Sequence, residues 1–413
     1  MKGILVVMDG LGDLPNPQLG NRTPLEAAET PNMDFFAARG ELGYMYTVKE
    51  GYVPESDEAI VSMFGNDLSS SSRGQLEAKG AGLKLMRGDL ALRANFASID
   101  SFKEGNIVDR RVGRTLTTKE AELLSRDINK IPMPVNFIFK PTIQHRAVLI
   151  FKGGFSDSIS GNDSFYFQGK LKEVSKIVQC KNTDDEENSL YTANVINEFL
   201  EKVYKVLENH PVNEARRKKG LLPANYLLVR GAGIEPLKLN QYKKWLAVCY
   251  MPLEIGFSMA SGMKALSFEY PKLKGLDSYA NLWEGLEMAC KIAVKCLKNN
   301  HDNYDYAYIH IKETDLPGHD NKPIEKKNML EFIDTNLFKF LRNFCPPNEI
   351  KLAVTGDHST PCRLKSHSSD PVPVLLYNFG IPRERHFNEK EALKGSLGKI
   401  EGKEFLKKIG YVK

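Results

Sequence analysis

Acidic and histidine residues follow three apolar segments that lie far apart in the sequence. The segments and the residues after them are residues 3–8 with Asp9, residues 306–311 with Asp315 and His319, and residues 352–355 with Asp357, His358 and His367. Each segment has the length and composition of a short buried strand. Because chemistry in parallel α/β sheets collects beyond the carboxyl ends of the strands, we expect these side chains to meet at one sheet edge. Carboxylates and imidazoles are ligands for divalent cations, so the sequence predicts a metalloenzyme with two metal ions.

A serine stands at the start of a further helical segment. Ser56 precedes a helix that we expect from Asp57 to about Phe64, where Gly65 closes it. Serine is a preferred N-cap residue, so capping alone explains Ser56, and taken alone the residue fits a cap better than a nucleophile. The second interpretation requires a metal ion on the hydroxyl oxygen, which removes its proton, and a helix N-terminus that favours an incoming phosphate.

These residues require a scaffold built from both ends of the chain. A length of 413 residues predicts two domains. The middle of the chain carries strand and helix patterns but none of the candidate metal ligands. We therefore predict an α/β core of residues 1–87 and 246–413, with a mostly parallel sheet flanked by helices, and an inserted α+β domain over residues 88–245. The patterns predict strands at residues 146–151 and 226–230, helices at residues 31–39, 189–209, 282–298 and 328–344, and a tail from residue 402 with a short helix and a strand-like end.

Composition and charge exclude several classes of protein. The hydrophobic fraction of 42% and the charged fraction of 26% are typical of a soluble globular protein. The chain lacks a run of about 18 apolar residues and a signal-peptide pattern, so we expect a cytoplasmic protein without a membrane partner. The net charge of +5 suits a small anionic substrate and does not favour nucleic acid. The six cysteines form no metal-binding pair and are expected to be free thiols, and a homo-oligomer is left open.

Several sequence strings occur together in one order. They are Val-Met-Asp-Gly-Leu-Gly at residues 7–12, the serine turn, the segment at residues 310–319 and Val-Thr-Gly-Asp-His-Ser-Thr-Pro at residues 354–361. This set resembles the alkaline phosphatase superfamily, for which the last string is specific. The chain looks more closely like the archaeal type of cofactor-independent phosphoglycerate mutase, over nearly its whole length. Further strings that fit this resemblance lie at residues 23–28, 30–34, 80–82, 88–96, 109–114 and 366–373.

The resemblance implies an alkaline-phosphatase-like fold and assigns the metal ligands residue by residue. One ion would be bound by Asp315, His319 and His367, and the other by Asp9, Asp357, His358 and the oxygen of Ser56. Two neighbouring cations clamp the attacking and leaving oxygens of an in-line phosphoryl transfer. Manganese is the first expectation, while zinc, cobalt and magnesium remain alternatives. No 2,3-bisphosphoglycerate is implied. The other histidines are expected to be core or surface residues: His145, His210, His301, His310 and His386.

The inserted segment would supply the groups that bind the substrate. Asp109, Arg110, Arg111 and Arg114 lie close together in the sequence. Arginine forks bind carboxylate and phosphate in two-point geometry, and phosphoglycerate carries both groups. A charged surface loop is the alternative, and the resemblance favours function, with Asp109 positioning a hydroxyl or moving a proton and Arg110 as a further catalytic candidate. Further candidates for substrate binding are Arg93, Arg230, Lys264 and Lys312.

The chain departs from the family pattern around the serine. The family has glycine where this chain has Glu55, and Thr-Ala-His where this chain has Glu58, alanine and isoleucine. A carboxylate beside the nucleophile repels phosphate unless it points away.

The resemblance implies an isomerase that interconverts 3-phosphoglycerate and 2-phosphoglycerate, a step of glycolysis and gluconeogenesis, through a phosphoserine at Ser56. The alternatives are a metal-dependent phosphomonoesterase or phosphodiesterase, and a non-catalytic duplicate that binds a metabolite.

Overall fold

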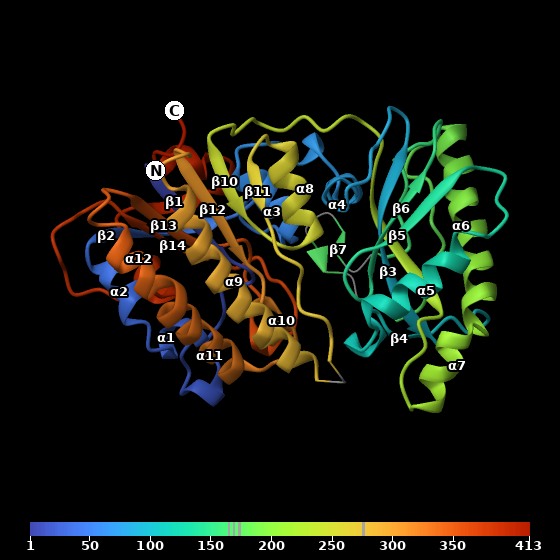
Figure 1. Cartoon of the computed structure of the whole chain (residues 1–413), viewed down its shortest axis with the longest axis horizontal. Helices are drawn as coiled ribbons and strands as arrows, with labels where there is room; N and C mark the ends of the chain where they lie inside the picture. Colours follow the sequence, from blue (N-terminus) through green and yellow to red (C-terminus); the bar gives the residue numbers. More distant parts are fainter. Residues whose placement is uncertain (164–165, 168–169, 172–174, 275–276) are drawn as a thin grey trace.

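The computed structural model describes residues 1–163, 166–167, 170–171, 175–274 and 277–413. Figure 1 shows two bodies side by side, each built on its own sheet, with helix α4 (Arg73–Gly80) at the junction. Both ends of the chain form the larger body, and the middle of the chain forms the smaller one. Among the described residues, no helix has the length and apolar character needed to cross a membrane.

The larger body is built on an eight-stranded sheet. In spatial order its strands are β11 (Lys264–Leu266), β10 (Trp245–Val248), β12 (Tyr306–Ile311), β1 (Gly3–Met8), β13 (Lys351–Gly356), β14 (Val372–Tyr377), β2 (Gly40–Tyr46) and β15 (Gly398–Glu401). The strands from β11 to β13 are parallel, and β14 alone runs against its two neighbours. The predicted α/β class with a mostly parallel sheet is confirmed.

Helices cover both faces of this sheet. Every residue of β1 is buried, as a strand between two apolar layers must be. One layer contains α2 (Pro31–Ala38), α9 (Ser278–Asn300), α11 (Pro323–Ile333) and α12 (Lys339–Phe344), and the other contains α3 (Ser56–Met63), α8 (Pro252–Ala260) and α14 (Phe405–Lys408). Short helices α1 (Pro24–Ala27), α10 (Asp315–His319) and α13 (Glu389–Ala392) lie in the connections.

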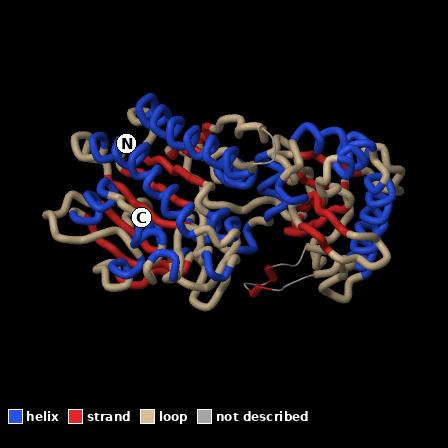
Figure 2. The backbone as a smooth tube through the Cα atoms, turned by 90° about the horizontal axis from the view of Figure 1, so that it is seen from below, coloured by secondary structure: helices blue, strands red, loops and turns tan. Residues whose placement is uncertain are grey.

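The smaller body is an antiparallel sheet with helices on its outer face. Its strands are β3 (Leu90–Ile99), β4 (Ile107–Asp109), β5 (Phe137–Pro141), β6 (Arg146–Phe151) and β9 (Tyr226–Gly233). Helices α5 (Thr118–Ile128), α6 (Glu187–Glu208) and α7 (Pro211–Lys218) belong to this body, and Figure 2 shows helices on the side away from the larger sheet. A small ribbon of β7 (Tyr166–Phe167) and β8 (Lys170–Leu171) completes the strands. The exact ends of the inserted domain, residues 88 and 245, stay a prediction.

Two expectations for the local structure need correction. The helix expected over residues 328–344 is interrupted by a π-helical turn, Asp334–Phe338, where the Asp334 carboxylate accepts the backbone N–H groups of Asn32 and Met33 at the start of α2. The tail forms α14 but no strand follows it, because the Tyr411 ring turns inward and its hydroxyl donates to Ile4 O at 2.9 Å. The 3-10 turns are Pro17–Leu19, Leu68–Ser70, Val112–Arg114, Cys362–Leu364 and Gly402–Glu404.

Candidate active site

Three neighbouring strands deliver the candidate metal ligands to one edge of the large sheet. β12, β1 and β13 are adjacent and parallel, and their last residues lie in register. Asp9, Asp315 and Asp357 therefore follow strand ends that meet. The N–H of Gly10 donates to Asp357 Oδ1 at 3.0 Å, and the Thr314 hydroxyl donates to Asp9 O at 2.6 Å. These hydrogen bonds hold together the loops that follow β1, β12 and β13.

His358 lies at the centre of one half of the site. Its Nε2 is 3.1 Å from Asp9 Oδ1, 3.5 Å from Asp357 Oδ2 and 3.3 Å from Ser56 Oγ. All four residues are buried. The Nδ1 of His358 lies 3.0 Å from Thr360 Oγ1, so the other ring nitrogen faces the three oxygens. This half contains every residue that the resemblance assigned to one ion.

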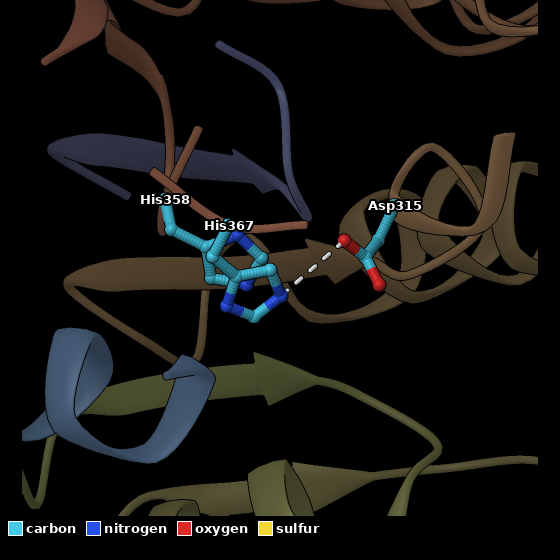
Figure 3. Close-up of side chains that lie close together, drawn as sticks. All are labelled: Asp315, His358 and His367. Carbon is cyan, nitrogen blue, oxygen red and sulfur yellow. Dashed lines mark ion pairs between the residues drawn. The ribbon is translucent and has the colours of Figure 1, made fainter. Parts of the chain in front are cut away.

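The other half of the site contains Asp315, His319 and His367. The Asp315 carboxylate lies 3.3 Å from His319 Nε2 and 3.7 Å from His367 Nε2. Figure 3 shows the His358 and His367 rings stacked beside Asp315. The centroids of the two rings are 3.7 Å apart. Ligand atoms of Asp315, His358 and His367 lie within 4.8 Å of one another, so His358 connects the two halves.

Backbone carbonyls orient two of these rings. His319 Nδ1 lies 3.1 Å from Lys365 O, and His367 Nδ1 lies 2.9 Å from Pro54 O. A carbonyl oxygen only accepts, so each Nδ1 carries the proton, and Nε2 keeps its lone pair. This is the arrangement in which a neutral imidazole binds a metal ion through Nε2.

His310 belongs to the site although its sequence position favoured an ordinary core residue. Its Nε2 lies 3.6 Å from Asp357 Oδ2, and the ligand atoms of Asp9, His310 and Asp357 fall within 4.8 Å of one another. The Tyr308 hydroxyl lies 2.7 Å from His310 Nδ1. Burial lowers the pKa of His310 well below its usual value, which keeps the ring neutral. The alternation of Tyr308 and His310 along β12, continued by Lys312 directly after the strand, was the available signal, since strand alternation places such residues on one face.

The donor set fits divalent metal ions. Asp9 Oδ1 and Asp357 Oδ2 are buried and have no hydrogen-bond partner among the described residues. Burial and the nearby Asp9 raise the pKa of Asp357, and burial and the nearby His358 lower that of His367. Buried carboxylates that repel one another, together with imidazole nitrogens, are the environment that a cation stabilises.

Ser56 is not the N-cap that the sequence predicted. Glu55 holds that position, and Ser56 is the first residue of α3. The Ser56 hydroxyl points to His358 Nε2 at 3.3 Å, and the helix start is closed instead by the Glu55 N–H, which donates to Glu58 Oε2 at 2.9 Å. The serine hydroxyl is thus available for chemistry, because another residue of the turn does the capping.

Lys312 lies beside the metal-type ligands. Its ammonium group forms an ion pair with Asp9 and a second with Glu254 at 2.8 Å. Burial would lower the pKa of Lys312, but the two carboxylates outweigh it and hold the pKa above its usual value. A fixed positive charge therefore lies next to the carboxylates at the floor of the site.

A cavity of about 690 Å³ opens over these residues and reaches the smaller body. Its floor includes Asp9, Ser56 and Lys312, and its opposite wall includes arginines of the small sheet and its turns. Lys264 does not line it: this residue is exposed at the start of β11, the end of the strand away from the site. The sequence could not locate Lys264, because it gives no strand direction relative to the cavity.

The cavity arginines differ in their partners. Arg110 pairs with Asp163, Arg114 with Asp320 at 2.6 Å, Arg93 with Glu77 at 3.3 Å, and Arg230 with Glu55 and Asp163. Arg111 and Arg146 form no ion pair with the described residues. Burial and neighbouring arginines lower the pKa of Arg111 to about 10 and also lower that of Arg146. Unpaired, half-buried positive charge favours a bound anion, and Arg146 is a cavity residue that the sequence analysis missed.

Asp109 shapes the turn that carries these arginines. Its Oδ1 accepts the N–H groups of Arg111 at 2.7 Å and Gly113 at 2.8 Å. The residue lines the cavity. Its carboxylate therefore orders the turn with one oxygen while the side chain borders the space where a substrate would lie.

Comparisons with known proteins point to one family. A family model described as 2,3-bisphosphoglycerate-independent phosphoglycerate mutase matches residues 37–213. A protein of that name from Pyrococcus furiosus is 39% identical over 97% of this chain and 94% of its own length, and one from Methanocaldococcus jannaschii is 34% identical over 98% and 96%. Among solved structures, a Pyrococcus horikoshii protein is 32% identical with a TM-score of 0.75, covering 100% of this chain and 98% of its own. The cofactor-independent phosphoglycerate mutase of Thermoplasma acidophilum is 29% identical with a TM-score of 0.57, covering 100% and 99%.

Proposed function

This chain belongs to the family of 2,3-bisphosphoglycerate-independent phosphoglycerate mutases, and from this premise we propose that it interconverts 3-phosphoglycerate and 2-phosphoglycerate through a phosphoserine at Ser56. It is then an isomerase whose substrate is a small phosphorylated acid. The observation that carries the assignment of Ser56 is its hydroxyl, 3.3 Å from His358 Nε2 in a cavity that arginines line from the other body.

Two divalent ions complete the proposed site. Asp315, His319 and His367 would hold one, and Asp9, Asp357, His358 and the Ser56 oxygen the other. Bound ions supply Lewis acidity that lowers the pKa of the serine hydroxyl and neutralises phosphoryl oxygens. Manganese remains the first candidate, with zinc, cobalt or magnesium as alternatives.

The chain's own residues then carry the transfer. Ser56 Oγ gives up its proton and bonds to phosphorus as the bond from phosphorus to the substrate oxygen breaks, and that oxygen takes a proton; the reverse holds when Oγ is released. The glycerate turns while held, its other hydroxyl loses a proton and attacks the phosphorus, and the Ser56 bond breaks. Asp109 lines the cavity and can give or accept the hydroxyl proton. Lys312 neutralises phosphate charge beside Asp9.

The substrate anions are assigned to the arginines without an ion pair. Arg111 and Arg146 line the cavity, and His145 beside them is buried with its Nδ1 unpartnered among the described residues. Guanidinium groups bind carboxylate or phosphate in two-point geometry. Three other arginines already pair with carboxylates, so each can bind the substrate only if its ion pair opens: Arg110, Arg114 and Arg230.

Replacing Ser56 tests the proposal. Ser56→Ala removes the nucleophile, so we expect mutase turnover to fall by about a thousandfold or more. Formation of 2-phosphoglycerate and release of free phosphate are measured together, and phosphoenzyme is sought by intact-protein mass spectrometry. The matched control is Ser62→Ala, a buried serine of the same helix.

Intact turnover in Ser56→Ala would overturn the phosphoserine mechanism. Phosphate release by the unmodified protein without any isomer would instead favour a phosphomonoesterase of the same fold.

A further inference from the structure

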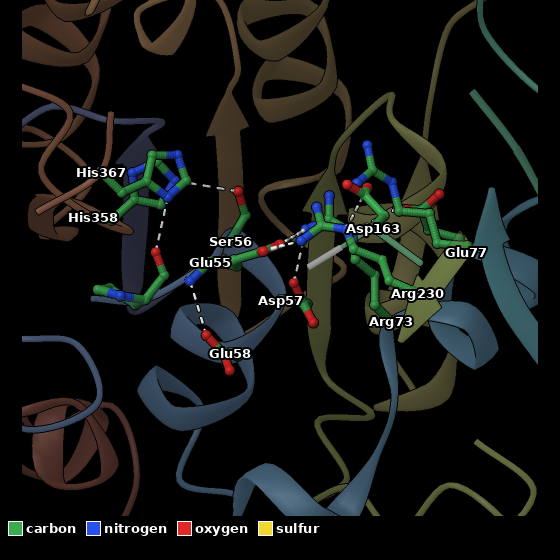
Figure 4. A network of polar contacts seen from close by, with 12 residues as sticks. Glu55, Ser56, Asp57, Glu58, Arg73, Glu77, Asp163, Arg230, His358 and His367 are labelled. Carbon is green, nitrogen blue, oxygen red and sulfur yellow. Dashed lines mark hydrogen bonds and ion pairs between the residues drawn. The ribbon is translucent and has the colours of Figure 1, made fainter. Parts of the chain in front are cut away.

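Glu55, which replaces the glycine that the resemblance implied before the serine, points away from the Ser56 hydroxyl. Its carboxylate is buried, with 6% of the residue exposed. One oxygen lies 2.8 Å from the Arg73 guanidinium, and the other pairs with Arg230. Figure 4 shows the Glu55 side chain directed at both guanidinium groups, while the Ser56 side chain is directed at the histidines. The carboxylate thus does not face the position of an incoming phosphate.

The two arginines belong to different parts of the molecule. Arg73 is the first residue of α4 at the junction, and it also pairs with Asp57 at 2.8 Å and Glu77 at 2.9 Å. Arg230 lies in β9 of the small sheet. Glu55 therefore connects the turn that carries the nucleophile in one body to a strand of the other.

The same residues separate two spaces. Glu55, Arg73, Asp163 and Arg230 line the main cavity, and they also line a smaller recess of about 220 Å³. The other residues of the recess include Asp57, Glu58, Asp157 and Ser160, all half-buried and polar, so water can occupy it. The ion-paired side chains form a wall between this polar recess and the cavity that contains Ser56.

We propose that Glu55 is a positioning residue that keeps this wall closed and so excludes water from the phosphoserine. The inference rests on the proposed function. Without the wall, a water oxygen attacks the phosphorus, the bond from phosphorus to Ser56 Oγ breaks, Oγ takes a proton from that water, and inorganic phosphate leaves. The wall thus favours return of the phosphoryl group to glycerate over its loss to water.

Two substitutions of Glu55 separate the effects of volume and charge. Glu55→Gly removes the side chain and opens the wall, and Glu55→Gln keeps the volume but removes the charge that holds Arg230. Formation of 2-phosphoglycerate and release of phosphate are measured on the same manganese-loaded sample in ¹⁸O-labelled water. We expect the ratio of phosphate release to isomer formation to rise about tenfold or more in Glu55→Gly and less in Glu55→Gln, with ¹⁸O in the released phosphate.

Controls distinguish this role from a general loss of structure. Lys152→Gln removes an ion pair to Asp89, 2.7 Å long, that lies within the smaller body and away from both spaces, and it should leave the ratio unchanged. Arg230→Gln should raise the ratio as Glu55→Gln does. A purely structural defect lowers both rates together, so an unchanged ratio in both Glu55 variants overturns the inference while leaving the mutase assignment intact. The mutase assignment is tested separately, by isomer formation in the unmodified protein and by Ser56→Ala.

Discussion

At the scale of single residues, buried charged groups fix the loops that carry the metal-type ligands. The Lys326 ammonium is fully buried and donates to Asp13 at 2.8 Å, to Gly12 O at 3.3 Å and to Thr360 O at 3.1 Å. It therefore joins the loop after Asp9 to the loop after His358. A buried ion pair with additional hydrogen bonds orders its surroundings even where its net stabilisation is small.

A carboxyl group beside this ion pair should make stability depend on pH. Glu389 accepts the Thr23 hydroxyl at 2.6 Å and the Asp13 N–H at 3.2 Å, and burial raises its pKa from 4.5 to about 7. A pKa that is higher in the folded state stabilises the fold below the unfolded pKa, and this contribution is lost as the pH rises through the folded pKa. We expect the free energy of unfolding to fall by about 1–3 kcal/mol between pH 4.5 and 7 because of this group.

Glu389→Gln keeps an accepting oxygen but cannot ionise, so this part of the fall should disappear. Urea unfolding across the same pH range measures it, with Glu122→Gln, an exposed helical carboxyl group, as control. Parallel stability curves for the unmodified protein and Glu389→Gln would contradict the prediction.

At the scale of elements, the joint between the two bodies is a contact of two helix backbones. A Cβ at Gly256 of α8 would lie 1.8 Å from Leu76 O of α4, and a Cβ at Gly80 of α4 would lie 1.8 Å from Pro252 O. On its other side, α4 packs Ala78 against the small sheet. The position of Arg73, and through it of Glu55, depends on this close approach.

Adding one methyl group to the joint should therefore move it. Gly256→Ala must push α4 away from α8, and we expect a loss of about 1–3 kcal/mol of stability from the overpacking. Thermal unfolding measures the loss, and mutase activity should fall with it because the cavity changes shape. Met259→Ala on the exposed side of the same helix is the control and should change little. If Gly256→Ala is as stable as the unmodified protein, α4 and α8 can move apart without a loss of stability, and the prediction is wrong.

At the scale of the whole molecule, the site joins residues from both ends of the chain and both bodies. Asp9 and Ser56 come from the first part of the chain, and the remaining metal-type ligands come from its last hundred residues. Arg114 of the smaller body pairs with Asp320, the residue after His319, and Gln144 donates to Asn281 at 3.1 Å. The two bodies are thus held together across the cavity by polar contacts that a substrate can exchange.

Metal ions should stabilise the whole fold, because they bind ligands that only the folded chain assembles. Removing divalent ions with a chelator should lower Tm, and manganese at one hundred times its Kd should restore about 2.7 kcal/mol for each site. Thermal unfolding during a manganese titration measures this. Asp357→Asn should weaken the response, since it removes one buried carboxylate. If the Tm of the unmodified protein does not change when manganese is added, the two-ion site is contradicted.

The sequence by itself determined the fold class and the residues that follow the central strands. Apolar runs of strand length, each followed within a few residues by aspartate, predicted parallel strands with their carboxyl ends at one edge, and Asp9, Asp315 and Asp357 meet there. The helix starting near Ser56 was also predictable from its turn residues, although the capping residue was assigned one position too late.

Only the tertiary structure decided which groups are paired and which are free. It turned Glu55 from a repulsive neighbour of the serine into the partner of Arg73 and Arg230, left Arg111 and Arg146 without ion pairs among the described residues, and brought His310 beside Asp357. Local patterns reflect backbone geometry over a few residues, whereas the pairing of charges depends on distances between segments that the fold brings together, from 18 residues apart for Glu55 and Arg73 to 175 for Glu55 and Arg230.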